Sequence, residues 1–375
     1  AVQAIKPRIQ EVELLQKDGA WHIYRPESPS LLGIEGDPEK PLSTDVEDAK
    51  LARSAVLSSK QVVQMGSQWV SDPMQIKIRE MVRSGKLGQV TKIEHVWNDN
   101  NHRWHQPDDP DVAALREEDT DWKRWLLGKP YVPFDPWKYF EFRIFREYSG
   151  GITSQWMSHG SGLVHFYTDT TIPDSMVANG GIFGWPDIRQ NPDTFQALAT
   201  YNDAKLLYSY SSSYANRFGD YTCIRGKEGT LFAHGGEGSA SWFFIPEHQN
   251  LPGGFDFFDG LKEMVRKGQA EAVTVKEYGM KPGPVSLSDD SKYHLDNWAD
   301  CMRARNADTN GNIHTGYWNA IASVMATYAY RQGKVSADLT IVSVDLASKT
   351  IVLSRNNVCP LIIIACNTSS AKALR

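Results

Sequence analysis

The feature that most constrains the fold is a succession of short segments, rich in aromatic and β-branched residues, between residues 176 and 244. Short polar connections, such as Asn-Asp-Ala-Lys at 202–205, separate them and favour hairpins over crossovers. The expected strands lie at 176–178, 195–201, 206–210, 222–225 and 230–232. This pattern predicts a large, mainly antiparallel sheet.

Helical and strand patterns flank this sheet on both sides. A capping box of Thr44 and Glu47 predicts a helix to about Ser58, and Asp72 followed by Pro73 predicts the start of the next helix. The remaining expected elements are a buried strand at 62–65, a strand at 89–97, and helices with an apolar stripe through 295–302 and 318–329. We therefore expect an α+β fold in which helices flank an open-faced sheet.

Composition narrows the class of protein. Of 375 residues, 41% are hydrophobic and 23% charged, which is ordinary for a soluble globular chain of two domains or one large one. The formal charge of −5 argues against a nucleic-acid partner, and no apolar run is long enough to predict a membrane span. The four cysteines show no metal-binding spacing, which predicts no metal site and fits reduced thiols, with a disulfide left open. A soluble protein is expected, with the cytoplasm favoured and the compartment otherwise unknown.

The stretch 148–165 carries the clearest candidates for chemistry. The glycine pair Gly150 and Gly151 leads into a segment that contains Gln155 and, four residues later, His159. In a helix these two side chains would share a face, and two glycines would let a ligand or another backbone come close. An imidazole placed there could transfer a proton from a hydroxyl. A purely structural histidine remains an open alternative.

Residues 142–151 followed by His159 resemble the catalytic motif of the glucose–fructose oxidoreductase (Gfo/Idh/MocA) family, which has a glycine pair, then Asp, then His four residues later. Glu39-Lys40-Pro41 resembles a second mark of that family. Similar segments at 180–183, 191–194 and 226–230 extend the resemblance over roughly residues 38 to 335. One departure is chemical: Gln155 occupies the position of the family's Asp and cannot accept a proton.

The resemblance implies NAD- or NADP-linked oxidation or reduction of a sugar or polyol. Lys40 would polarise the reacting oxygen or relay its proton, and His159 would be the acid–base residue beside Gln155. Glu39, Lys40 and Pro41 would lie at the cofactor. Weaker candidates for substrate contacts are Arg143, Trp97, Asn98 and Tyr139. Residues 98–105 combine amides, imidazoles and indoles at a strand end, which suits either carbohydrate or a solvated loop.

A dinucleotide-binding fingerprint is missing. No Gly-x-Gly-x-x-Gly follows a predicted strand, and the glycines at 33 and 36 lack that spacing. One βαβ unit takes about 30 residues, so the stretch before the Glu-Lys-Pro mark cannot hold the family's nucleotide domain. We expect an unassigned segment at 1–32, a remnant of a Rossmann-like α/β domain at 33–70, a substrate and oligomerisation domain at 71–338, and an unassigned β-rich tail at 339–375.

Two features leave open whether the chain is truncated or chimeric. Residues 365–368 (Ala-Cys-Asn-Thr) resemble locally the active-site segment of glutamate racemases, although a racemase domain cannot fit in the tail. A coincidental match, a chimeric tail or an extended tail is favoured over a racemase, and the missing fingerprint leaves a truncated chain open as well.

Two classes of function follow from these observations. The first is an oxidoreductase with a shortened or separately supplied nucleotide-binding part. The second is a catalytically silent carbohydrate-binding or assembly protein, and cofactor-free lyase chemistry at His159 is a weaker third. The exposed face of the sheet should be apolar and need cover, which predicts a homo-oligomer formed through that face.

Overall fold

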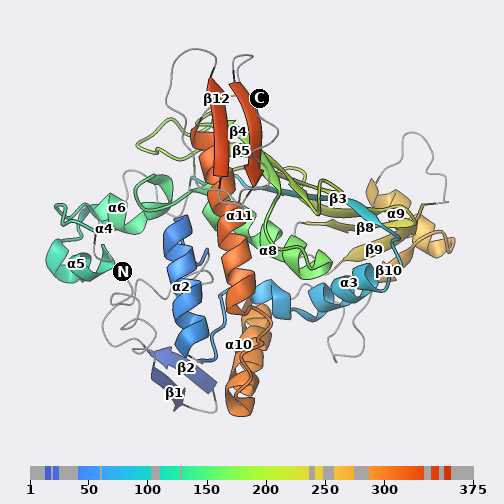
Figure 1. The fold of residues 1–375 in the computed structure, drawn as a ribbon, viewed down its shortest axis with the longest axis horizontal. Coiled ribbons are helices and arrows are strands. Elements are labelled where there is room, and N and C mark those ends of the chain that lie inside the picture. The colour runs from blue at the N-terminus through green and yellow to red at the C-terminus, as the bar shows by residue number, and fades with distance from the viewer. Residues whose placement is uncertain are drawn as a thin grey trace.

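The computed structural model describes residues 13–17, 20–24, 41–59, 61–102, 110–126, 129–235, 241–247, 257–273, 287–332, 339–345 and 350–355. An eight-stranded sheet forms the centre of the fold, in the order β10-β9-β8-β7-β3-β6-β5-β4 (Figure 1). Every neighbouring pair is antiparallel except β3 and β6, which run parallel. The strands are β3 (Val90–Asn98), β4 (Ser175–Gly181), β5 (Thr194–Tyr201), β6 (Leu206–Ser213), β7 (Tyr221–Gly226), β8 (Gly229–His234), β9 (Trp242–Pro246) and β10 (Glu271–Val273). The predicted antiparallel sheet is confirmed.

Three helices cover one face of this sheet: α3 (Pro73–Arg83), α8 (Met157–Thr168) and α11 (Ile313–Arg331). Their apolar side chains join those of the strands in one buried cluster, which includes Ile78, Leu163 and Ile321 from the helices and Ile93 and Tyr210 from the sheet. Burial alternates along the strands, as the period of two in a pleated sheet requires. This face holds the main core of the fold.

The opposite face is only partly covered. Helix α9 (Phe257–Arg266) packs Leu261 and Met264 against Cys223 and Phe232 of β7 and β8. Over β4 to β6 the alternate positions remain open, and they carry both apolar and polar side chains: Val177 and Leu198 are exposed, as is Gln196, with Ser209 and Ser211 partly exposed. The uncovered face is therefore mixed rather than apolar.

Two local predictions at the start of the chain were wrong. Helix α2 (Val46–Ser59) is capped by Asp45, whose Oδ1 accepts hydrogen bonds from the backbone N of Glu47 at 2.8 Å and of Asp48 at 3.1 Å. Thr44 was the predicted cap, but Asp serves equally well at this position and lies one residue later.

Residues 62–65 form no strand. Their backbone groups bond instead to the last helix pair and its connection: the indole of Trp298, in the first of the two helices, donates to the Val62 carbonyl at 3.0 Å, and the Met65 N donates at 2.7 Å to the carbonyl of Gly311, just before the second. An apolar run has the pattern of a strand even when its backbone bonds to other parts of the chain.

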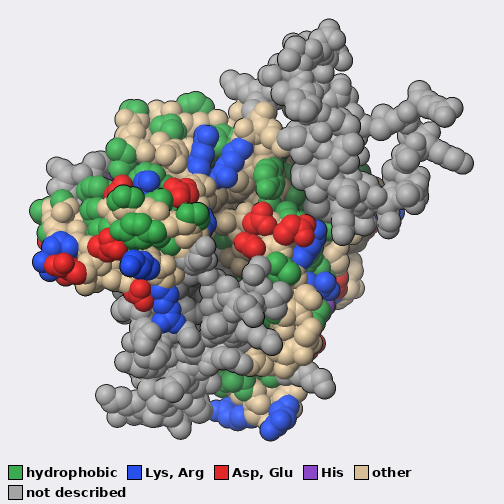
Figure 2. All heavy atoms as spheres, turned by 60° about the vertical axis from the view of Figure 1, so that its left-hand side comes forward, with side chains coloured by type: hydrophobic (Ala, Val, Ile, Leu, Met, Phe, Trp, Pro, Cys, Tyr) green, Lys and Arg blue, Asp and Glu red, His purple; other side chains and the backbone are tan. Residues whose placement is uncertain are grey.

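The remaining elements are short, apart from α10 (Leu287–Ala304). Helices α4 (Pro110–Ala113), α5 (Trp122–Trp125) and α6 (Pro136–Phe140) lie together at one side of the molecule. Figure 2 brings this side forward and shows hydrophobic, acidic and basic side chains intermixed on it. The other elements are α7 (Ile152–Gln155), the 3-10 helices η2 (Gln68–Ser71), η3 (Glu117–Asp119) and η4 (Phe142–Ile144), and the hairpins β1 (Glu13–Lys17) with β2 (Ala20–Tyr24) and β11 (Leu339–Asp345) with β12 (Thr350–Arg355). Among the described residues, no helix is both long and apolar enough to span a membrane.

Candidate functional site

His159 lies in the first turn of α8, half-buried among indole rings. The Trp69 ring centroid is 4.4 Å from that of His159, and the Trp97 ring meets it edge-on at 5.3 Å. Trp156 stacks on Trp97 at 4.7 Å with an interplanar angle of 9°. The structure thus brings two predicted residues, His159 and Trp97, into contact. Trp69 and Trp156 were missed, since nothing in their sequence surroundings distinguishes them from core tryptophans.

Gln155 is the last residue of α7, and Trp156 (φ −103°, ψ −47°) separates it from α8. The continuous helix that the spacing of Gln155 and His159 predicted is therefore interrupted. The Gln155 side chain is buried, with 8% exposure, and its Oε1 accepts a hydrogen bond from Nε of Arg143 at 2.6 Å. The structure joins these two predicted residues directly.

The backbone and side chain of Arg143 are both held in place. Its guanidinium lies over the Phe142 ring at 4.4 Å, and its carbonyl accepts a hydrogen bond from Nδ2 of Asn191 at 2.8 Å. Asn191 also donates to the carbonyl of Ser149. The loop before β5 therefore fixes the segment that presents Arg143.

The glycine pair makes room for protein rather than for a ligand. A Cβ added at Gly151, where φ is +69°, would lie 2.7 Å from Cβ of Asn191. A Cβ at Gly150 would lie 2.6 Å from Oγ1 of Thr153 and 2.8 Å from that of Thr327. Only glycine suits a packed position with this backbone. The prediction that a ligand or another backbone approaches here was wrong, because side chains of the protein fill the space.

Two other predicted substrate contacts have structural partners. The amide of Asn98 donates to the Phe218 carbonyl at 2.9 Å and accepts from the backbone N of Ser213 at 3.0 Å. Asn98 thus ties β3 to the β6–β7 connection. The Tyr139 ring packs against Trp125 at 5.9 Å and Phe134 at 6.0 Å, in an aromatic cluster of α5 and α6.

The structure describes only part of the Glu-Lys-Pro motif that was predicted to lie at the cofactor. Pro41 is half-buried just before α2, whereas Glu39 and Lys40 lie outside the residues that the structure describes. The described ranges contain one parallel strand pair, β3 and β6, and no strand–glycine turn–helix unit that could cradle a dinucleotide pyrophosphate. These residues alone therefore do not fit a nicotinamide cofactor.

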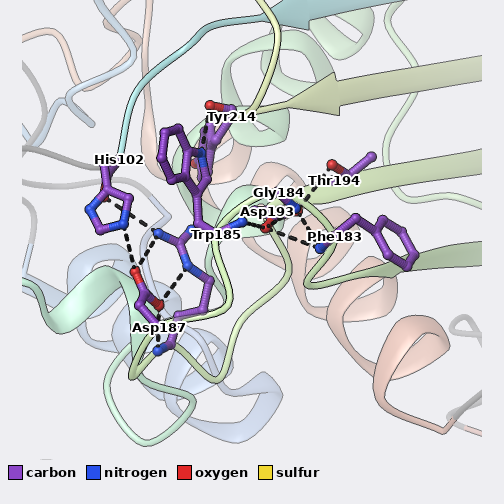
Figure 3. A network of polar contacts seen from close by, with 9 residues as sticks. His102, Phe183, Gly184, Trp185, Asp187, Asp193, Thr194 and Tyr214 are labelled. Carbon is purple, nitrogen blue, oxygen red and sulfur yellow. Dashed lines mark hydrogen bonds and ion pairs between the residues drawn. The ribbon is translucent and has the colours of Figure 1, made fainter.

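A second polar cluster lies in the connection between β4 and β5 (Figure 3). The sequence analysis did not predict it. The Asp187 carboxylate accepts hydrogen bonds from Nε and Nη2 of Arg189 at 2.9 and 3.0 Å, and Nε2 of His102 lies 3.1 Å from its Oδ2. Burial acts to raise the pKa of the Asp187 carboxyl, but the hydrogen bonds from Arg189 outweigh it and hold that pKa below its ordinary value.

Asp193 shapes the same connection. Its buried carboxylate accepts from the backbone N of Phe183, Gly184 and Trp185 and from the hydroxyl of Thr194 (Figure 3). The Trp185 indole then donates to the Tyr214 carbonyl at 3.0 Å and packs edge-on against His102. The Tyr214 ring in turn packs against Trp156 at 4.3 Å, which connects this cluster to the surroundings of His159.

Other titratable groups in the core have structural roles. Burial lowers the pKa of His95 to about 3 and that of His165 to about 4, so both rings are neutral at pH 7. The geometry at His165 makes its Nδ1 the donor to the Thr170 carbonyl at 3.1 Å. Within the described ranges, no three His, Cys, Asp or Glu side chains gather as metal ligands would.

Two surface depressions lie elsewhere on the molecule. One, of about 490 Å³, is lined by α3 residues including Arg79 and Arg83, and the other, of about 480 Å³, by the β7–β8 turn. Neither contains a residue of the His159 surroundings.

No family model matches the sequence, and no curated protein matches it. The fold nevertheless aligns with solved dehydrogenase structures. An inositol dehydrogenase homolog from Azotobacter vinelandii, complexed with NADH and myo-inositol, is 15% identical with a TM-score of 0.54, and the alignment covers 79% of this chain and 69% of that one. A putative oxidoreductase from Thermotoga maritima is 13% identical (TM-score 0.53; 79% and 70% covered), and a levoglucosan dehydrogenase in complex with NADH is 12% identical (TM-score 0.55; 78% and 70%). This chain therefore shares the fold of oxidoreductases of the Gfo/Idh/MocA type, as the sequence resemblance implied.

Proposed function

We propose that the protein is an NAD- or NADP-linked oxidoreductase that acts on a hydroxyl of a sugar or polyol, with His159 as the acid–base residue. The observation that carries this proposal is the half-buried imidazole of His159 between Trp69 and Trp97, in a fold shared with dehydrogenases. Solved relatives of this fold hold NADH with myo-inositol, or NADH. Indole rings present apolar faces on which the C–H face of a sugar can stack.

In this proposal each residue has a defined task. His159 accepts the hydroxyl proton during oxidation and returns it during reduction, while the bound nicotinamide supplies the hydride chemistry. Lys40 polarises the reacting oxygen, and Glu39, Lys40 and Pro41 lie at the cofactor together with parts of the protein outside the described ranges. Trp97 and Arg143 contact the substrate.

A second candidate function is a catalytically silent carbohydrate-binding protein. The Arg143–Gln155 hydrogen bond favours it, because an amide at this position cannot share a proton with His159. The two functions differ in one property, which is turnover with a nicotinamide.

To test this, the full chain is titrated with NAD and with NADP while its tryptophan fluorescence is recorded. Turnover is then measured with a panel of sugars and polyols. We expect saturable binding of one cofactor and a loss of about 10²- to 10⁴-fold in turnover in His159→Gln. The matched control is His234→Gln at the exposed end of β8, which should keep full turnover. Absence of saturable binding of either cofactor would reject the oxidoreductase in favour of the silent binder.

Restoring the carboxylate gives a second test. On a neutral sugar, Gln155→Asp should raise turnover, because an ionised group can share the proton with His159. Unchanged turnover would show that Gln155 does not limit proton transfer.

We also propose a homo-oligomer formed through the open face of β4 to β6. Exposed Val177, Leu198 and Phe183 support it, since burying apolar side chains drives association. Light scattering after gel filtration should give a mass above that of one chain, and Leu198→Lys should reduce it. A monodisperse monomer before substitution contradicts this part of the proposal.

A further inference from the structure

Arg79 is a half-buried cation that lacks a hydrogen-bond acceptor among the described residues. Its Nε is fully enclosed, yet no group in the described part of the chain accepts a hydrogen bond from it. The guanidinium lies over the Phe166 ring, with Cζ 4.5 Å from the ring centroid. Arginine stays charged in proteins, and a charge removed from water is ordinarily paired with an opposite charge. Arg79 therefore holds N–H donors in place for an acceptor that the described residues do not supply.

Arg83 brings a second guanidinium to the same side of α3, because it follows Arg79 by four residues. Its Nη2 donates to the Phe166 carbonyl at 3.1 Å and to the Asp169 carboxylate. The end of α8 thus restrains both arginines, since the Phe166 ring packs against the first and the Phe166 carbonyl bonds to the second. Side chains that are already restrained lose less conformational entropy when they bind a ligand.

The two arginines line a surface depression of about 490 Å³, whose other lining residues are Ile76, Glu80 and Ser84. This volume lies within the range of about 300–1,000 Å³ that is usual for small-molecule sites. Glu80 has a cation of its own, because Nζ of Lys77 lies 3.3 Å from its carboxylate. The depression therefore combines guanidinium groups with an apolar side chain and has room for more than a simple ion.

The electrostatic surroundings of Arg79 favour an anion. Burial lowers the pKa of the Arg79 guanidinium, and the neighbouring charge of Arg83 lowers that pKa further. The charges of Asp169 and Asp308 act in the opposite direction, but neither carboxylate is hydrogen-bonded to Arg79. A bound anion would counter the repulsion between the two arginines and would offer Arg79 the acceptor that it lacks among the described residues.

We propose that this depression binds the phosphate group of a small phosphate ester, with Arg79 as the main contact and Arg83 beside it. A phosphate monoester carries a charge of about −1.5 to −2 at pH 7 and three acceptor oxygens, which suits two guanidiniums better than a carboxylate does. The site is separate from His159, which lies seven residues before Phe166 on α8, or about 10 Å along the helix axis. The inference goes beyond the proposed oxidoreductase and does not depend on it.

Calorimetric titration of the full chain tests the site without any turnover. Glycerol 3-phosphate should bind saturably, with a dissociation constant at least about tenfold lower than that of glycerol, as expected for charge-assisted hydrogen bonds. Arg79→Gln should weaken this binding at least about tenfold, and Arg79→Lys, which keeps the charge but loses the planar fork, should weaken it less. The matched control Arg266→Gln removes an exposed helix arginine that pairs with Glu263, and it should leave the binding unchanged.

Urea unfolding separates loss of binding from loss of folding. Arg79→Gln should unfold at a urea concentration similar to that of the unmodified chain, because it removes a charge that has no hydrogen-bonded counter-charge among the described residues. Saturating glycerol 3-phosphate should raise the urea midpoint of the unmodified chain and of Arg266→Gln, but not that of Arg79→Gln.

Each other outcome overturns one specific claim. Absence of saturable binding, or binding that is unchanged in both Arg79→Gln and Arg79→Lys, overturns the site. Equally tight binding of inorganic phosphate overturns the assignment to an ester, and equally tight binding of acetate overturns the assignment to a phosphate group. Binding that saturating NAD or NADP displaces would belong to a cofactor site and would also overturn the inference. Absence of nicotinamide-linked turnover rejects only the proposed oxidoreductase.

Discussion

Two arginines of this molecule meet different partners. Arg189, whose side chain is 1% exposed, forms two hydrogen bonds with the Asp187 carboxylate, which His102 also contacts. Arg143 is half-buried and bonds through Nε to the neutral Gln155. The first cation bonds to a carboxylate, and the second bonds to a neutral amide.

The difference lies in the partner of each guanidinium. A buried charge is tolerated when it is paired and hydrogen-bonded, and removing one member of such a pair is costly. A hydrogen bond from an arginine to an amide restrains both side chains in a similar way, but its acceptor carries no charge.

The largest effect should come from breaking the paired cluster. Asp187→Ala leaves the Arg189 charge buried without its carboxylate, and we expect the free energy of unfolding to fall by about 3–5 kcal/mol. Urea unfolding followed by tryptophan fluorescence measures this change. The control Asp300→Ala removes one partner of an exposed helix pair with Arg303 and should change stability by less than about 0.5 kcal/mol. Similar losses in both variants would show that Asp187 is no more than a surface charge.

A pH series probes the buried histidines of the core. Burial lowers the pKa of His165 to about 4, whereas an unfolded imidazole has a pKa of about 6.5. The unfolded state therefore binds more protons as the pH falls from about 6.5 to about 4, and His165 alone should lower the free energy of unfolding by about 1.4 kcal/mol per pH unit, or about 3 kcal/mol in total. His95 contributes a similar share, which makes the expected slope of the unmodified protein about twice as steep, so His165→Phe should show about half that slope in urea unfolding.

Converting the second cluster into a copy of the first should have a smaller effect. Gln155→Glu places a carboxylate against Arg143, and we expect a gain of about 1 kcal/mol in the free energy of unfolding from the charged hydrogen bond after desolvation. A loss of stability would indicate that the desolvation cost exceeds the pairing, and that the two arginine surroundings differ in more than charge.

The smallest change in stability should come from a carboxylate that accepts hydrogen bonds only from the backbone, and it gives a lower limit for comparison with Asp187. Asp45→Ala removes the cap of α2 and should cost about 0.5–1 kcal/mol, while Thr44→Ala should cost nearly nothing. Thermal unfolding of the two variants checks this order. The reverse order would restore Thr44 as the cap.

Local pattern predicted much of the fold, because each element that it identified is stabilised by its own residues. The antiparallel strands, the Asp72 cap of α3 and the apolar stripes of α10 and α11 all follow from periodicity and turn chemistry within a few positions. The strand predicted at 62–65 failed because the backbone there depends on side chains more than 200 positions away, such as Trp298.

The site was predictable only in part, for the same reason. The motif resemblance identified His159, Gln155, Arg143 and Trp97, and the structure joins them in two contacting pairs. Trp69 and the cluster of His102, Asp187 and Arg189 depend on tertiary contacts between segments that carry no mutual signal in one sequence. Asn98 and Tyr139 have residue types suited to a sugar, but their bonds and packing serve the fold.

The position of β3 in the sheet sets the order in which the chain can assemble. This strand ends at Asn98, yet its two neighbours are β6 and β7, which end at Ser213 and Gly226. During synthesis on the ribosome, β3 must therefore wait for more than a hundred further residues to emerge before either edge can pair. Trp97 lies near the end of β3, so the aromatic surroundings of His159 are completed only after the strands on both sides of β3 have paired with it.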